Sequence, residues 1–145
     1  MPIPIHRDAY ETLIRPGILP RPDPFAYPSS GMILAWISLE NYRNLSNQKL
    51  IFSGQANIIS GKNGQGKTNL LEAIFLLAST RSFRTPQIRD VIQWGTMGFR
   101  LEGEVERHQK AYCLDIQQLE SSKKLRINQK PRDIFDYIGH LNAQV

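Results

Sequence analysis

The sequence predicts an α/β fold, with a mixed sheet around one buried helix and an antiparallel β meander after it. A glycine-rich loop, residues 61–68, is followed at once by an apolar segment, residues 69–79, which is typical of a buried helix. Between residues 100 and 127, apolar and polar side chains alternate as they do in half-exposed antiparallel strands. The chain has 145 residues, a length that suits one domain.

Charge and composition limit the classes of function. The formal net charge is +5 at pH 7, which favours a polyanionic partner such as a nucleotide or a nucleic acid. The chain has no run of about 20 apolar residues and no amino-terminal signal pattern, so we expect neither a membrane span nor secretion. A single cysteine, Cys113, excludes an internal disulfide, and a cytoplasmic location fits this best.

Residues 1–31 differ in composition from the rest of the chain. Seven of the nine prolines lie within the first 28 residues, and each disfavours a helix at the residue before it. We expect a Pro-rich extension over 1–31, disordered or not native, and a folded part over 32–145. The extension is a docking tail for a partner, or else a passive extension or the product of a misassigned start codon, in which case Met32 is the true start.

The folded part begins with short apolar segments. Met32–Leu39, Ile51–Ser53 and Ala56–Ser60 are each predicted to be strands, the last two separated by turn residues. The helix over 69–79 follows, apolar nearly all round with Glu72 as its one charge, and we expect it in the interior. Three meander strands then lie near residues 100–106, 112–116 and 124–128, before a short helix within 133–141.

The chemistry is predicted between the strand at 56–60 and the helix. The segment matches G-x-x-x-x-G-K-[ST] in full, a pattern in which glycines let backbone amides approach phosphate and the helix amino terminus adds free N–H groups. The lysine would bridge β- and γ-phosphate oxygens, and the threonine hydroxyl would bind Mg²⁺. Its residues are Gly61, Lys62, Asn63, Gly64, Gln65, Gly66, Lys67 and Thr68.

Several further segments narrow the family, because the loop alone occurs in kinases, GTPases, transporters and DNA-repair ATPases. Several segments resemble the amino-terminal part of the RecF family and occur in the same order. They are residues 32–44, the loop with residues 68–74, and residues 81–85, 92–95, 125–128 and 139–142. These proteins are recombination-mediator ATPases related to SMC and ABC heads. Gln129 stands where the family more often has glycine after asparagine, so we expect a looser turn there.

The resemblance implies a P-loop NTPase of ABC/SMC head type, of which this chain would be the first lobe only. It implies binding of ATP with Mg²⁺, an ATP-dependent homodimer in the full-length protein, and slow ATP hydrolysis. It also implies binding to single-stranded and gapped DNA, cooperation with RecO and RecR, and loading of RecA in recombinational repair, replication and the SOS response.

The resemblance implies roles for individual residues. Gly61–Thr68 and the adjoining Asn69 would bind the nucleotide, and Thr68 would also bind the metal. Arg43 resembles a basic residue that reaches phosphate from the first strand in related heads; the alternative is a solvated arginine at a strand end. Arg81, Arg84 and Arg89 follow the helix and would contact DNA phosphates, or else form a solvated face.

Two motifs of a complete head are missing from the sequence. After Thr68 there is no apolar strand ending in an acidic pair (Walker B) and no S-x-G-x signature, so no catalytic residue is expected in this chain. We therefore expect an incomplete head, with an exposed apolar face on the helix and poor solubility. The alternatives are a truncated, non-hydrolysing nucleotide- or DNA-binding module and, more remotely, a small P-loop kinase.

Overall fold

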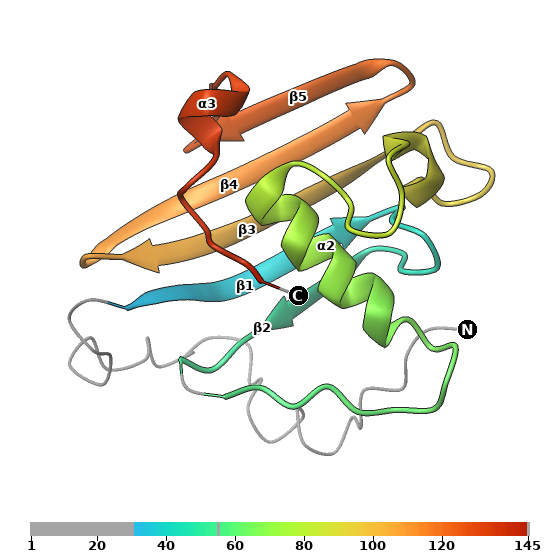
Figure 1. The fold of residues 1–145 in the computed structure, drawn as a ribbon, viewed down its shortest axis with the longest axis horizontal. Helices are drawn as coiled ribbons and strands as arrows, with labels where there is room; N and C mark the ends of the chain where they lie inside the picture. Colours follow the sequence, from blue (N-terminus) through green and yellow to red (C-terminus); the bar gives the residue numbers. More distant parts are fainter. Residues whose placement is uncertain (1–30, 55, 145) are drawn as a thin grey trace.

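The structure is a computed structural model that describes residues 31–54 and 56–144. Six strands form one sheet in the order β2-β1-β3-β4-β5-β6, and every pairing among them is antiparallel (Figure 1). The strands are β1 (Met32–Glu40), β2 (Gln48–Ile51), β3 (Gly98–Arg107), β4 (Lys110–Leu119), β5 (Ser122–Ile127) and β6 (Lys130–Pro131). The helices are α2 (Lys67–Ser79), the 3₁₀ helix η1 (Ile88–Val91) and α3 (Ile134–Tyr137).

Most of the predicted elements are confirmed. The first strand, the three meander strands and the apolar helix appear as β1, β3, β4, β5 and α2. The last predicted helix is the single-turn α3, where the Asp133 carboxylate caps the helix by accepting a hydrogen bond from the Asp136 amide at 2.9 Å. None of the helices in the described residues is long and apolar enough to span a membrane. Of the extension predicted over 1–31, residues 1–30 lie outside the described residues, so the division between residues 31 and 32 stays a prediction.

One predicted strand is wrong and one is displaced. Residues 56–60 have no regular secondary structure, and Ile58 is 94% exposed. A strand forms only where a neighbouring strand accepts its hydrogen bonds, and the described residues place none beside this segment. β2 occupies Gln48–Ile51 and ends where the predicted strand at Ile51–Ser53 was to begin.

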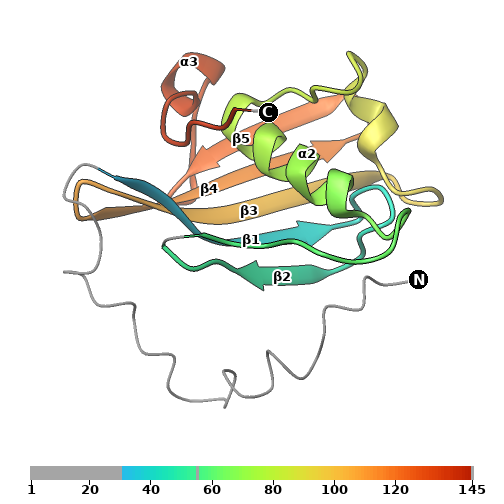
Figure 2. The same ribbon diagram turned by 60° about the horizontal axis from the view of Figure 1, so that its bottom comes forward.

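The core lies between α2 and the inner face of the sheet. α2 crosses the strands diagonally, and α3 lies on the same side (Figures 1 and 2). Buried residues of α2 meet the inward residues of β1, β3 and β4, and Gly103 lets the helix approach. A Cβ atom at Gly103 would lie 2.7 Å from Leu77 Cδ2 and 2.9 Å from the Trp36 carbonyl oxygen. Close helix–sheet packing therefore depends on a residue without a side chain.

The side of α2 at Leu71 and Ile74 is incompletely covered by the rest of the described residues, as the sequence predicts. Leu71 is 46% exposed and Ile74 is half-buried. Together they border a groove of about 340 Å³, whose other apolar lining residues are Met32, Ile33, Leu34, Phe52 and Ile59. The exposed apolar face is thus confirmed, whereas the poor solubility expected from it stays a prediction.

The β5–β6 turn is tighter than the sequence predicts. Ile127 pairs with Lys130, which leaves a two-residue loop formed by Asn128 and Gln129. Both loop residues have a positive φ, 51° and 65°, in the left-handed region that favours glycine at the second position. The side chain of Asn128 supports the turn by accepting a hydrogen bond from the Cys113 amide at 2.9 Å.

Candidate functional site

The glycine-rich loop forms an open turn that leads directly into α2. Gly61, Gly64 and Gly66 have φ values of 152°, 79° and 103°, a backbone geometry that L side chains rarely adopt. Residues 61–64 are exposed, and α2 begins at Lys67 without a side-chain cap. The first N–H groups of α2 are therefore available to an anion, and the helix dipole favours negative charge there.

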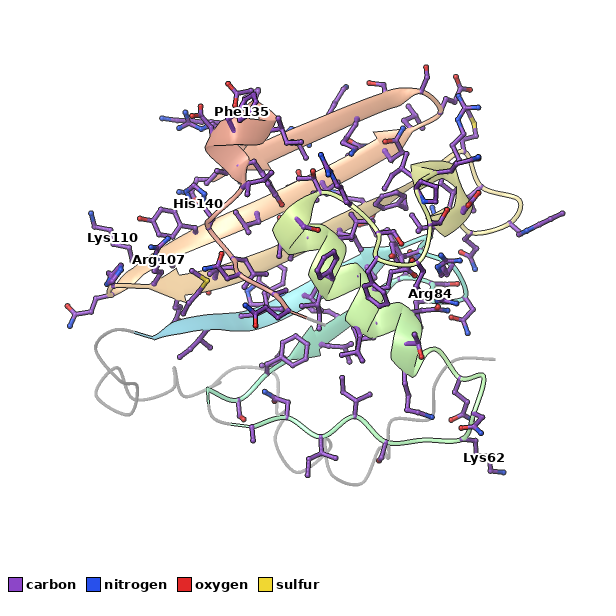
Figure 3. All side chains as sticks on the ribbon, in the orientation of Figure 1. Lys62, Arg84, Arg107, Lys110, Phe135 and His140 are labelled. Atoms are coloured by element: carbon purple, nitrogen blue, oxygen red, sulfur yellow. The ribbon has the colours of Figure 1, made fainter. Side chains whose placement is uncertain are left out.

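Lys67 lies across this loop. Its Nζ donates hydrogen bonds to the carbonyl oxygens of Gly61 at 2.5 Å and Lys62 at 2.8 Å. The Gln65 side chain braces the same turn by accepting a hydrogen bond from the Lys62 amide at 3.1 Å. Lys62 itself extends away from the protein at the far end of the loop (Figure 3). The two lysines therefore differ: only Lys67 is directed toward the centre of the loop.

The turn after β1 packs against the end of the glycine loop. A Cβ atom at Gly66 would lie 2.8 Å from Leu45 Cδ2 and 2.9 Å from Asn44 Oδ1. Asn44 Oδ1 also accepts a hydrogen bond at 2.7 Å from Nδ2 of Asn69, in the first turn of α2. This turn thus fixes the position of the loop, and Gly66 is the residue that permits the contact.

Glu72 joins three segments of the site. Its side chain is fully buried on α2 and accepts hydrogen bonds from Arg43 Nε at 2.5 Å and Arg43 Nη2 at 2.8 Å. The Ser82 hydroxyl donates to it at 2.5 Å, and Arg84 Nη1 lies 3.4 Å from its Oε2. A buried carboxylate needs such partners, because its charge is costly to remove from water.

These contacts alter the electrostatics of the site. Burial alone would raise the pKa of Glu72, but the hydrogen bonds from Arg43 and Ser82 and the two nearby guanidinium charges hold that pKa below its ordinary value. Hydrogen bonding to Glu72 raises the pKa of Arg43 further above its ordinary value, although burial opposes this. Burial, assisted by the charge of Glu72, also raises the pKa of Tyr42 far above that of free tyrosine. Glu72 is therefore ionised near neutral pH and Tyr42 is not.

The three arginines expected to contact DNA have different surroundings. Arg84 turns toward α2 and donates a hydrogen bond to Asn69 Oδ1 at 2.7 Å. Arg81 follows Thr80, whose carbonyl oxygen accepts a hydrogen bond from Lys123 Nζ at 3.0 Å. Burial and the charge of Arg81 both lower the pKa of Lys123. Arg89 is exposed on η1. A role of these residues in DNA binding stays a prediction.

The structure brings the loop residues and Asn69 into one region, and their binding to a nucleotide stays a prediction. The sequence analysis misses Glu72, Ser82 and Asn44 as supports of this region. One signal was available for Glu72, the only charged residue in the apolar segment 69–79. Thr68 is exposed in the first turn of α2, and its role in binding Mg²⁺ stays a prediction. The described residues contain no cluster of three or more His, Cys, Asp or Glu that would hold a metal on its own.

Comparisons with known proteins agree with this geometry. Residues 33–140 match the family model "RecF/RecN/SMC N terminal domain". The chain is 43% identical over 119 residues to the DNA replication and repair protein RecF of Geotalea daltonii, covering 79% of this chain and 32% of the relative. It is 38% identical over 113 residues to the RecF protein of Geobacillus thermodenitrificans, covering 77% and 30% of the two chains.

A solved structure supports the same assignment. The structure of the recombination mediator protein RecF with ATPrS, in the RecFOR pathway, superposes with a TM-score of 0.72 at 32% identity, covering 77% of this chain and 31% of that one. The match thus spans about 30% of the length of the curated relatives. The chain belongs to the RecF/RecN/SMC N-terminal domain family, and residues 33–140 correspond to the amino-terminal part of RecF, the first lobe of an ABC/SMC-type P-loop NTPase head.

Proposed function

We propose that this chain is the ATP-binding part of a RecF-like DNA replication and repair protein. One observation carries the proposal: Lys67 spans an open glycine loop at the uncapped amino terminus of a buried helix. Similar solved structures are those of RecF with ATP and with ATPrS, which supports ATP as the ligand.

The chemistry of binding follows from this geometry. A triphosphate entering the loop would accept hydrogen bonds from the backbone amides of the loop, whose residues 61–64 are exposed, and from the first turn of α2. Its oxygens would replace the carbonyl oxygens of Gly61 and Lys62 as partners of Lys67 Nζ, which already points into the loop. The Thr68 hydroxyl would hold Mg²⁺, which neutralises charge on the β- and γ-phosphates when it is bound.

We further propose that this chain binds ATP without hydrolysing it unaided. Glu72, the only acidic residue of α2, is buried and already accepts hydrogen bonds from Arg43 and Ser82, so it is unsuited to act as a general base. Turnover would then require groups from the rest of a RecF-like protein, whereas a self-contained binding module would use the loop as a switch. Hydrolysis by this chain, abolished by Lys67→Ala, would contradict both forms of the proposal.

The activity of the whole protein is proposed from its relatives. The curated relatives are named DNA replication and repair protein RecF, and the similar solved structures are those of the recombination mediator protein RecF in the RecFOR pathway. We propose that the complete protein dimerises around ATP and binds single-stranded and gapped DNA. Together with RecO- and RecR-type mediators, it would promote RecA loading during recombinational repair and the SOS response.

Two lysine variants test ATP binding. Lys67→Ala removes the ammonium group that spans the loop, and Lys62→Ala removes an equal charge that points away from it (Figure 3). We expect titration with Mg·ATP to show a loss of affinity of at least about 10-fold for Lys67→Ala, the scale of a charge-assisted hydrogen bond. Lys62→Ala should retain the affinity of the wild type. Equal affinities for all three proteins would contradict the proposed ATP site.

A further inference from the structure

A pocket beside α3 shares no residue with the nucleotide site. It has a volume of about 350 Å³, within the range of about 300–1,000 Å³ that is common for ligand pockets. We infer that this pocket and the exposed side of α3 bind an acidic segment of a partner protein, one that also carries an apolar side chain. We call it the α3 pocket, and its lining includes Tyr112, Ile127, Lys130, Arg132, Asp136 and His140.

Strand pairing brings the side chains of the α3 pocket to one face of the sheet. Ile127 pairs with Leu114 on β4 and with Lys130 on β6, and residues paired in this way share a face. Tyr112 lies two residues before Leu114 on β4, so its side chain is on that face as well. Its ring packs edge-on against His140, with the ring centroids 5.1 Å apart. The pocket therefore has an aromatic and aliphatic lining with a lysine at its edge.

The β3–β4 hairpin adds two cationic residues to this end of the sheet. Arg107 pairs with Lys110 across the hairpin, and both lie near His140 (Figure 3). Arg107 Nη1 donates a hydrogen bond at 2.9 Å to the carbonyl oxygen of Gly139, the residue before His140. This bond holds the hairpin against the segment that follows α3.

Positive charge therefore surrounds the α3 pocket. Arg107, Lys110, Lys130 and Arg132 are all exposed. Within residues 31–54 and 56–144, the one ion pair that involves any of the four joins Arg132 to Asp136, with Arg132 Nη1 and Asp136 Oδ2 3.8 Å apart. Three cations thus have no carboxylate partner in this part of the chain, and charge complementarity favours an anionic ligand.

The outer side of α3 is apolar and exposed. Phe135 is 89% exposed and Ile138 is 48% exposed, whereas Tyr137 between them is buried in the core. Residues three apart lie on the same side of a helical turn, so the two exposed side chains are neighbours. Exposed aromatic and aliphatic side chains next to cationic ones are typical of a surface that binds another protein.

The charges on α3 favour a peptide over a nucleic acid. Asp133 and Asp136 are both exposed and flank Phe135 in the sequence. The backbone of a nucleic acid carries a phosphate at every nucleotide, so a strand that reached Phe135 would bring phosphates close to these carboxylates. A peptide can place carboxylates over the lysines and an apolar side chain on α3, which satisfies both parts of the surface.

The test is a titration of the 145-residue chain with the capped peptide Asp-Glu-Asp-Phe-Asp-Glu-Asp. We expect saturable binding that weakens as salt is added. Lys130→Glu should lower the affinity by about 10-fold or more, because it places a like charge against the peptide. Lys124→Glu is the matched control: Lys124 is exposed on the same strand pair but lies on the other face from Leu125 and Ile127, so its variant should bind nearly as the wild type does.

A second variant tests the apolar part of the surface. Phe135→Ser removes a side chain that is almost fully exposed, so the protein should still fold. We expect it to lower the affinity for the phenylalanine peptide by about 5-fold or more. The affinity for the same peptide with serine in place of phenylalanine should not change. Equal affinities of wild type and Phe135→Ser for the phenylalanine peptide would overturn the role of α3 in the inference.

Three further outcomes would overturn the inference. One is the absence of saturable peptide binding by the wild type. Another is an equal loss in Lys124→Glu and Lys130→Glu, because binding would then depend on net charge and not on the pocket. The third is a single-stranded oligonucleotide that binds in place of the peptide and is weakened by Lys130→Glu, which would assign the pocket to nucleic acid. Lys67→Ala should bind the peptide as the wild type does, so failure of the proposed ATP site is distinguished from failure here.

Discussion

Arg43 and Glu72 form a bidentate ion pair that joins the turn after β1 to α2, in which Arg43 Nη2 and Glu72 Oε1 lie 2.8 Å apart. The two residues are 29 positions apart in the sequence, and the Glu72 carboxylate is fully buried. The same carboxylate accepts a hydrogen bond from Ser82, in the segment that follows the helix. One acidic side chain thus fixes three segments around the phosphate loop.

Removing Arg43 should destabilise the fold. Arg43→Ala leaves Glu72 buried with only Ser82 and Arg84 as partners, and an incompletely paired buried charge is costly. We expect a loss of about 2–3 kcal/mol in the free energy of unfolding, measured by urea denaturation. Arg89→Ala, on the exposed η1, provides the control and should stay within about 0.5 kcal/mol of the wild type. A wild-type midpoint for Arg43→Ala would show that the pair does not stabilise the fold.

The ionisation of Glu72 should make stability depend on pH. Its pKa in the folded protein is lowered, against the effect of burial, mainly by hydrogen bonds from Arg43 and Ser82. This stabilisation is therefore fully present above the pKa of an unfolded glutamate, about 4.3, and is lost as the pH falls through the folded value. Denaturation of the wild type and Glu72→Gln at several pH values should show their difference in stability shrinking below about pH 4. A constant difference down to acidic pH would contradict this.

The contact between Gly103 and α2 predicts an overpacked variant. Gly103→Ala places a methyl group 2.7 Å from Leu77 Cδ2 and 2.9 Å from the Trp36 carbonyl oxygen, both closer than normal contacts allow. We expect a loss of about 1–3 kcal/mol in unfolding free energy. Shortening the Leu77 side chain on the helix should recover part of the lost free energy of unfolding. The double variant Gly103→Ala/Leu77→Ala should lose less free energy of unfolding than the two single variants lose in sum. Strict additivity of the two losses would show that the residues do not clash.

The left-handed turn at Asn128–Gln129 predicts a stabilised variant. Gln129 has a φ of 65°, which costs a residue with a side chain about 1 kcal/mol relative to glycine. Gln129→Gly should therefore raise the unfolding midpoint. Gln109 closes the β3–β4 hairpin with a φ of 61° and offers an independent repeat of the test. A lower midpoint for both glycine variants would show that the turns do not have this geometry.

The exposed side of α2 predicts a difference between neighbouring leucines. Leu71 is 46% exposed at the apolar groove, whereas Leu70 is only 3% exposed in the core. We expect Leu71→Arg to reduce aggregation, measured by light scattering against concentration, with little change in the unfolding midpoint. Leu70→Arg should prevent folding, because it buries an unpaired charge. Unchanged aggregation in Leu71→Arg would mean that the groove is not the surface that associates.

An element of the fold can be predicted from the sequence when the residues that determine it are close to it in the chain. The alternation in β3, β4 and β5 and the apolar run of α2 depend on neighbouring residues, and both were predicted correctly. The glycine loop was equally visible, because its geometry needs specific residue types at fixed spacing. A strand at residues 56–60 depends instead on a neighbouring strand to pair with, and the local sequence pattern does not show whether one is present.

The inward direction of Arg84 has the same kind of cause. Its orientation follows from Asn69 and Glu72, 15 and 12 residues earlier in the chain, and these acceptors come near only once α2 and the following segment have folded together. From the sequence alone, Arg84 was indistinguishable from Arg81 and Arg89. The fold gives the three different surroundings: Arg84 donates to Asn69 on α2, Arg81 follows Thr80, which Lys123 contacts, and Arg89 is exposed on η1.

The central claim is that residues 61–68 bind the phosphates of ATP through their backbone amides. The most direct measurement is the change in amide chemical shifts of the ¹⁵N-labelled chain on titration with Mg·ATP. We predict that the largest saturable shifts occur at Gly61, Gly64, Gly66 and the first turn of α2, and that in Lys67→Ala they require at least about 10-fold more ATP to saturate. Shifts confined to other surfaces, or loop shifts that saturate at the same ATP concentration in Lys67→Ala, would contradict the claim.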